Sequence, residues 1–181
     1  ADDAGCQQQR QAGTPGEVAT GEDAAASTRT SPTTPQGPTS IPLPAPANFV
    51  ARVSNKYSPF LPGTKWVYRG GTPQERERIV VTVLDRTKLI EGIEATVVRD
   101  TVRVNGELLE DTFDWYAQDR RGRVWYLGED TRTYENGQVV STEGSWEAGV
   151  DGAQAGVTMF KKPRVGKPYR QEYYAGQAED Q

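Results

Sequence analysis

Two Asn-Gly pairs, each flanked by runs of alternating apolar and polar residues, constrain the fold of this chain more than any other feature. Asn105-Gly106 and Asn136-Gly137 favour type I′ turns, because both central residues of such a turn need a positive φ, and these turns join antiparallel strands. Between them, Asp119-Arg120-Arg121-Gly122 is typical of a type I turn followed by glycine in the left-handed region. No window shows a sustained 3.6-residue apolar period. The sequence therefore predicts an all-β protein, an antiparallel meander that forms an open sheet or a partial barrel.

The Asn-Gly turns also predict how the strands beside them are aligned. A two-residue loop at the first turn pairs Val104 with Glu107, Val102 with Leu109, Asp100 with Asp111, Val98 with Phe113 and Thr96 with Trp115. This register separates a mostly apolar face from a polar one, as expected of a half-buried hairpin. The same procedure at the second turn pairs Glu135 with Gln138, Tyr134 with Val139 and Thr133 with Val140.

The first 55 residues differ in composition from the rest of the chain. They hold seven of the twelve prolines and one aromatic residue, Phe49, whereas all four Trp and all eight Tyr follow. Such a segment buries too little apolar surface to offset the entropy lost on ordering. We therefore expect residues 1–55 to be a disordered Pro/Thr/Ala-rich tether and residues 56–181 to be an antiparallel β domain. A C-terminal continuation of this domain is an open alternative.

Cys6 is the single cysteine, so the chain can form no internal disulfide and the domain must rest on its hydrophobic core. Ala4-Gly5-Cys6 resembles the end of a bacterial lipoprotein box, in which cysteine becomes the lipidated first residue, although Asp3 stands where the box has an apolar residue. We therefore expect an extracytoplasmic protein that is secreted, or lipid-anchored at the cell envelope through Cys6. An incidental cysteine in a flexible tail is the alternative.

Charge and the absence of histidine argue against several classes of function. The net charge is −4, with 20 acids and 18 bases after residue 55, so we expect neither nucleic acid nor an anionic membrane as a partner, apart from the lipid anchor itself. Four cations cluster locally, which we interpret as a solvated loop with a polyanion site as the alternative: Lys161, Lys162, Arg164 and Lys167. Without histidine, Ser-His-Asp and Cys-His catalysis and histidine-ligated metals are excluded.

The predicted register places two carboxylates, Asp100 and Asp111, opposite each other on the otherwise apolar face. Opposed like charges destabilise a strand pair, so a compensating group is expected. Oxygen ligands suit calcium or magnesium, which makes this pair a candidate metal site, and Glu129 or Asp130 could approach it. Arginine or threonine partners, protonation of one acid, a wet rim, or a bulge that turns Asp111 to the other face are the alternatives. No other cofactor is expected.

Aromatic residues gather around the two hairpins, and five of them are candidate ligand-binding residues: Trp115, Tyr116, Trp125, Tyr126 and Tyr134. Adjacent residues of a strand point to opposite faces, so one member of each Trp-Tyr pair is expected to face solvent. An exposed aromatic row suits stacking on a sugar or docking of a protein, with ordinary core and surface packing as the alternative.

Three motifs resemble an uncharacterised family of bacterial exported or lipoprotein-like β domains: DWYAQD at 114–119, VWYLGED at 124–130 and YRQEYY at 169–174. The resemblance covers the chain from about residue 55 onward. It implies an exported β domain that continues past the last residue given, and it implies no activity and no functional residue.

Together these features favour a non-enzymatic extracytoplasmic binding module for an unknown protein, glycan or envelope ligand. Two alternatives stay open. One is a calcium-stabilised structural domain, and the other is a carboxylate-dependent hydrolase that uses Asp100 and Asp111 as its acid and base.

Overall fold

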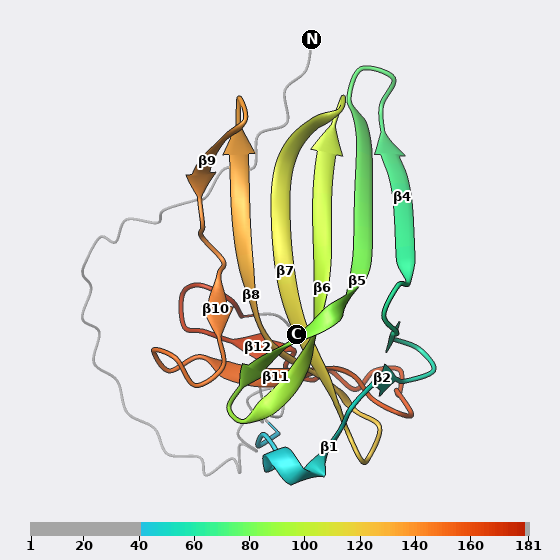
Figure 1. Cartoon of the computed structure of the whole chain (residues 1–181), viewed down its shortest axis with the longest axis vertical. Coiled ribbons are helices and arrows are strands. Elements are labelled where there is room, and N and C mark those ends of the chain that lie inside the picture. Colours follow the sequence, from blue (N-terminus) through green and yellow to red (C-terminus); the bar gives the residue numbers. More distant parts are fainter. Residues whose placement is uncertain (1–40, 180–181) are drawn as a thin grey trace, which may run out of the picture. The chain divides into compact units, whose positions relative to one another are not determined.

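A computed structural model describes residues 41–179, which lie within the compact unit Pro35–Gln181 (Figure 1). The expected lipidation site Cys6 and the first 40 residues of the expected tether lie outside the described residues. Apart from one short 3-10 helix, every element is a strand, which confirms the all-β fold. The elements are η1 (Pro46–Asn48), β1 (Phe49–Val50), β2 (Val53–Ser54), β3 (Pro59–Phe60), β4 (Lys65–Gly71), β5 (Arg76–Ile90), β6 (Ile93–Val104), β7 (Glu107–Asp119), β8 (Val124–Glu135), β9 (Gln138–Ser141), β10 (Trp146–Glu147), β11 (Gln154–Met159) and β12 (Glu172–Tyr173).

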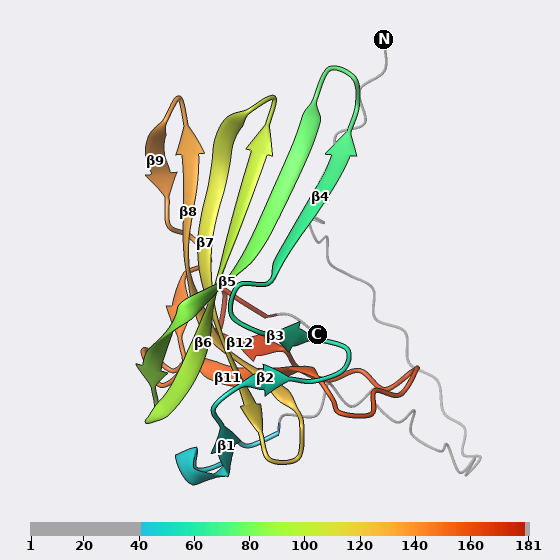
Figure 2. The same cartoon turned by 45° about the vertical axis from the view of Figure 1, so that its right-hand side comes forward.

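The strands form a curled, open antiparallel sheet, a half-barrel, in the order β12-β11-β8-β7-β6-β5-β4. Strands β4 to β8 are neighbours in space as they are in sequence, which confirms the meander. Strand β1 pairs with β7, β9 and β10 pair with β8, and β2 and β3 form a separate ribbon. We call the end with the β4–β5, β6–β7 and β8–β9 turns the upper end. Strands β2, β3, β11 and β12 lie toward the other, lower end (Figure 2).

The domain begins earlier than the composition suggested. Phe49 and Val50 pair with Asp119 and Gln118 of β7, and Val53 is only 1% exposed. The segment from residue 41 to 55 is therefore part of the domain, and the expected boundary at residue 55 is corrected. Prolines alternate with the apolar residues at the start of this segment, which hides those residues as a core signal in the sequence. Their burial is supplied by β7, which is far away in the sequence.

Turn chemistry is confirmed at all three predicted turns. The two Asn-Gly pairs have φ values of 52° and 94° in the first and 51° and 75° in the second, as a type I′ turn requires. In the third turn, Gly122 has φ 81° and its N–H donates to the carbonyl of Asp119 at 2.8 Å. These turns depend only on adjacent residues, which is why the sequence alone reveals them.

A β-bulge makes the predicted register of the first hairpin wrong beyond the turn. Val104 pairs with Glu107 as expected, but Val102 pairs with Glu110. The extra residue, Leu109, is 38% exposed rather than part of the core. Every later pair is shifted by one residue, and a shift of one residue exchanges the two faces of a strand.

Register shifts of this kind recur across the sheet. The second hairpin pairs Glu135 with Gln138 and Tyr134 with Val139 as predicted, and then Thr133 with Ser141 instead of Val140. Further shifts interrupt the β5–β6 and β7–β8 ladders. Because a bulge bends its strand and increases the local twist, these irregularities are consistent with a sheet that curls rather than lying flat.

The main core lies toward the lower end, where residues of β5 to β8 pack against β10 and the segment that follows it. Alternation along the expected strands predicts ten core residues, of which Leu109 is the exposed bulge residue described above. Five of the ten are buried: Val83, Val98, Trp115, Trp125 and Leu127. Four others are half-buried, because no second layer of described residues covers the upper part of the sheet: Ile79, Val81, Val102 and Phe113. Trp146 of β10 and Val157 of β11 complete the core. They flank residues 147–156, whose Gly, Ala and acid content predicts a loop, although β10 and β11 extend into both ends of that stretch.

Candidate functional site

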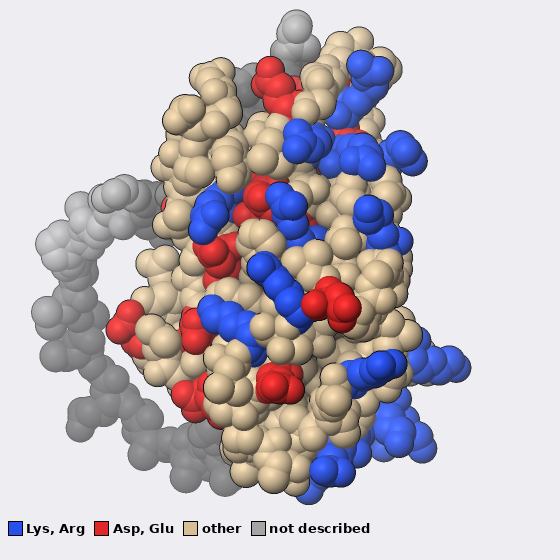
Figure 3. All heavy atoms as spheres, in the orientation of Figure 1, with Lys and Arg blue, Asp and Glu red and all other residues tan. Residues whose placement is uncertain are grey.

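Charged residues separate between the two faces of β4 to β8. Strand register and alternation put many carboxylates of these strands on one face, the acidic face, among them Glu77, Asp100, Glu110, Asp114 and Glu129. Every Lys and Arg in the paired positions of these strands lies on the other, cationic face: Lys65, Arg69, Arg76, Arg78, Lys88, Arg99, Arg103 and Arg132. Figure 3 looks onto the cationic face, where Lys and Arg side chains lie over β4 to β8.

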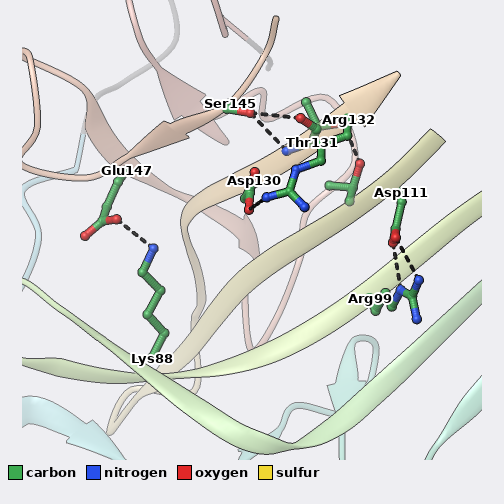
Figure 4. A network of polar contacts seen from close by, with 9 residues as sticks. Lys88, Arg99, Asp111, Asp130, Thr131, Arg132, Ser145 and Glu147 are labelled. Atoms are coloured by element: carbon green, nitrogen blue, oxygen red, sulfur yellow. Dashed lines mark hydrogen bonds and ion pairs between the residues drawn. The ribbon is translucent and has the colours of Figure 1, made fainter. Parts of the chain in front are cut away.

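Carboxylates on the cationic face have cationic partners (Figure 4). Asp111 receives two hydrogen bonds from Arg99, both of 2.7 Å, and Asp130 pairs with Arg132 at 3.0 Å. On the acidic face, within residues 41–179, no Lys or Arg forms an ion pair with a carboxylate of β5 to β8. The acids of the cationic face are thus paired with arginines, whereas the acids of the acidic face have no cationic partner among the described residues.

The centre of the acidic face is a cross-strand pair of acids. Asp114 of β7 lies directly opposite Glu129 of β8, and Tyr126 donates a 2.7 Å hydrogen bond from its hydroxyl to Oδ1 of Asp114. Farther up β6, Oδ1 of Asp100 is buried and has no hydrogen-bond partner among the described residues. The site thus contains acceptor atoms in excess of the donors that reach them.

Aromatic rings close the lower side of this acid pair. Tyr116 stacks on Tyr126 with ring centroids 4.8 Å apart, and Phe60 of β3 stacks on the other side of Tyr116 at 4.4 Å. Trp146 meets Tyr126 edge-on at 5.3 Å. The stack holds the Tyr126 ring in place, and with it the hydroxyl that donates to Asp114.

Burial and mutual repulsion make these carboxyl groups hard to ionise. Burial raises the pKa of Asp114 to about 7, although the Tyr126 hydrogen bond opposes the shift, and the charges of Asp100 and Glu110 add to it. Burial and then the charge of Asp114 raise the pKa of Glu129 to about 8. The pKa of Asp100 is also raised, first by burial and then by Glu110. The acid pair therefore titrates as a unit near neutral pH and retains a proton while no cation is nearby.

Three comparisons with known proteins add no further constraint. No family model, no curated protein and no solved structure matches the chain. The described residues also include no helix of the length and apolar character needed to cross a membrane. Any assignment of function therefore depends on the geometry of the site.

The structure separates the two candidate metal ligands. Asp100 pairs with Thr112 and Asp111 with Thr101, so the side chains of the two acids point to opposite faces of the sheet. The expected opposition of Asp100 and Asp111 is wrong because of the bulge at Leu109. Among residues 41–179 no group of three or more His, Cys, Asp or Glu side chains is placed to hold a metal ion. The calcium and hydrolase hypotheses thus lose the carboxylate pair on which they were based.

Asp111→Asn tests this corrected register. We expect the substitution to lower the free energy of unfolding by about 0.5–1 kcal/mol, because it removes a partly exposed ion pair with Arg99. Relief of repulsion between Asp100 and Asp111 would instead raise it. Urea unfolding at neutral pH measures the difference, with Glu143→Gln, a change at an exposed acid, as the control for a lost surface charge.

The five candidate ligand-binding aromatics do not form an exposed row. Three are buried, namely Trp115, Trp125 and Tyr126, and two are half-buried, namely Tyr116 and Tyr134. The Trp115 ring lies under the ammonium group of Lys88, 3.3 Å from its centroid, and the indole N–H of Trp125 donates to Asp119 at 3.1 Å. Of the five, only Tyr116 and Tyr126 contribute to the acidic site.

Sequence reasoning missed Asp114 and Glu110 as site residues. The predicted register placed the even-numbered residues of β7 on the polar face, where acids need no explanation. The available signal was an alternation of polar residues from Glu110 through Thr112 and Asp114 to Tyr116. This pattern alone could not distinguish a solvated face from a face on which carboxylates are partly buried.

Proposed function

We propose that the protein is a non-enzymatic binding module, located outside the cytoplasm, that receives a cationic group of its ligand on the acidic face. The observation that carries this proposal is that Asp100, Asp114 and Glu129 share a face on which β4 to β8 present no Lys or Arg in the paired positions. A bound cation would offset the repulsion among these groups and would favour their ionised forms.

The chemistry of the site favours an organic cation over a metal ion. An ammonium or guanidinium group is attracted to carboxylates and to aromatic faces alike, and the Tyr116–Tyr126 stack lies next to the acid pair. Metal ions require several converging oxygen ligands, and no such group is present among the described residues. Lysine or arginine side chains of a protein partner carry the matching groups. The extracytoplasmic location depends on the likeness of the Cys6 segment to a lipoprotein box.

Thermal melting in the presence of a tetralysine peptide tests the proposal. We expect the peptide to raise the melting temperature, because a ligand that binds only the native state stabilises it by linkage. The rise should be larger at about pH 9 than at about pH 6, since a cation binds the ionised carboxylates, whose pKa values are about 7 and about 8 in the free protein. Calorimetry in buffers of different ionisation enthalpy should also detect protons released on binding.

Matched variants separate the acidic face from general charge. Asp114→Asn/Glu129→Gln should abolish the effect of tetralysine, whereas Asp111→Asn/Asp130→Asn removes two charges from the cationic face and should retain it. An equal response of both variants, or no response of the natural chain to tetralysine, would disprove the proposed function. A response to calcium alone would favour the structural-domain alternative.

A further inference from the structure

Three loops that are far apart in the sequence meet at the lower end of the domain. Asn55, which is 5% exposed, donates from its amide nitrogen to the carbonyl of Gly122 at 2.8 Å and to that of Phe160 at 3.3 Å. Its amide oxygen accepts the N–H of Tyr57 at 2.8 Å. A Cβ on Gly122 would lie 3.0 Å from Cδ of Lys161, so the lysine stem packs against this turn. One buried side chain thus joins residues 52–57, 119–123 and 160–167 into one surface.

This surface is strongly positive although the whole chain is not. It exposes eight cations, which we call the basic loop patch: Arg52, Lys56, Arg120, Arg121, Lys161, Lys162, Arg164 and Lys167. The one acid in the three segments is Asp119, which is 1% exposed and pairs with Arg123 at 2.6 Å. The three segments themselves therefore expose no acid, and the net charge of −4 for the whole chain conceals this local excess of positive charge.

Apolar side chains protrude from the same patch. Val165 is fully exposed between Arg164 and Lys167, and Tyr57 is 55% exposed next to Lys56. Beside them, Phe160 and Tyr169 meet edge-on with centroids 4.7 Å apart and help to line an open cavity of about 200 Å³. Exposed apolar residues flanked by cations are typical of segments that enter the headgroup region of a bilayer.

The chain enters the domain at this end. Segment 41–44 and the turn that carries Arg120, Arg121 and Arg123 line one cavity of about 350 Å³. Cys6 precedes this segment in the sequence. A lipid anchor at Cys6 would therefore lead to the same end of the domain that carries the basic loop patch.

We propose that the basic loop patch docks on an anionic lipid bilayer. Val165 and Tyr57 enter the headgroup region, and the eight cations contact the phosphate groups around them. This surface includes none of the carboxylates of the acidic face, so it is separate from the proposed cation site. Protruding valine and tyrosine side chains favour a bilayer over nucleic acid, because a phosphate backbone offers no apolar layer for them to enter.

Co-sedimentation of the non-lipidated full chain with vesicles tests this proposal. We expect binding to vesicles of phosphatidylcholine mixed with phosphatidylglycerol and none to phosphatidylcholine alone. Each cation near an anionic surface contributes roughly fivefold to partitioning, so Lys162→Glu/Arg164→Glu/Lys167→Glu, which removes three cations and adds three acids, should weaken binding by at least about 100-fold. Val165→Asp should weaken the part of the binding that persists at high salt, since that part depends on apolar insertion.

A variant with the same charge change elsewhere is the control. Arg69→Glu/Arg76→Glu/Arg78→Glu reverses three exposed cations at the upper end of the cationic face and should bind nearly as the natural chain does. An equal loss in both triple variants, equal binding to neutral vesicles, or an unchanged Val165→Asp variant would overturn the proposal. So would tighter binding to duplex DNA than to anionic vesicles at matched salt.

Discussion

Asp114→Asn/Glu129→Gln should stabilise the protein in alkaline solution and have little effect in acid. Both carboxyl groups have raised pKa values in the folded protein, about 7 for Asp114 and about 8 for Glu129, against the ordinary values of 3.8 and 4.5 for these side chains. At pH values between the unfolded and the folded pKa of each group, the folded state holds a proton that the unfolded state has lost. The stability of the natural chain should therefore fall as the pH rises from about 4 to about 8, by on the order of 2–4 kcal/mol after allowance for the half-buried position of Glu129.

Urea unfolding at a series of pH values measures this dependence. The double variant should lose most of the slope and be the more stable protein at about pH 9, with Asp100 responsible for the slope that remains. Asp111→Asn/Asp130→Asn is the control, because its two carboxylates have arginine partners on the cationic face. A natural chain whose stability does not change, or rises, across this range would contradict the described state of the acid pair.

Asp119→Ala should cause the largest loss of stability of the substitutions considered, about 3–5 kcal/mol. Its side chain is 1% exposed and accepts hydrogen bonds from the Arg123 backbone N–H at 2.9 Å, from Nε of Arg123 at 2.6 Å and from the Trp125 indole at 3.1 Å. Removal of the carboxylate leaves these donors without a partner, and the Arg123 charge without compensation, in a site that water hardly reaches. The turn that joins β7 to β8 depends on these contacts.

The pH response of this site has the opposite sign to that of the acid pair. Burial alone would raise the pKa of Asp119, but the hydrogen bonds and charge of Arg123, with the Trp125 indole, lower it overall. Its contribution to stability is therefore present above the unfolded value of about 3.8 and is lost as the pH falls below it. Asp119→Asn should retain part of the stability that Asp119→Ala loses. Asp130→Ala, the control at a more exposed acid, should change the free energy of unfolding little. A loss below about 1 kcal/mol for Asp119→Ala would contradict the buried network.

Local chemistry made part of this architecture predictable. The Asn-Gly pairs and the Asp119–Gly122 turn depend on the backbone preferences of adjacent residues, so their positions and φ values followed from the sequence. The register did not, because the bulge at Leu109 is not encoded in the turn. Because of the bulge, Phe113 and Trp115 share a face with Val97 of β6 and Lys88 of β5. These contacts come from other strands, so the residues next to the turn do not predict them.

The candidate site, too, was predictable only in part from the sequence. Asp100 was singled out from the sequence as an acid that needs compensation, and its raised pKa agrees with that reading. Its partner was misidentified, because a single inserted residue exchanges the faces of β7 and brings Asp114 instead of Asp111 to its side. The sequence alone could not choose between the two registers, since both give an alternating pattern.

The sequence by itself determined the all-β class, the order of the long strands and the positions of their turns, because alternation and turn preference act over neighbouring residues. Tertiary structure decided which charges share a surface. The acids of the acidic face and the cations of the basic loop patch are dispersed along a chain whose totals nearly balance. Only bulges in the strands and the hydrogen bonds of Asn55 bring charges of one sign together.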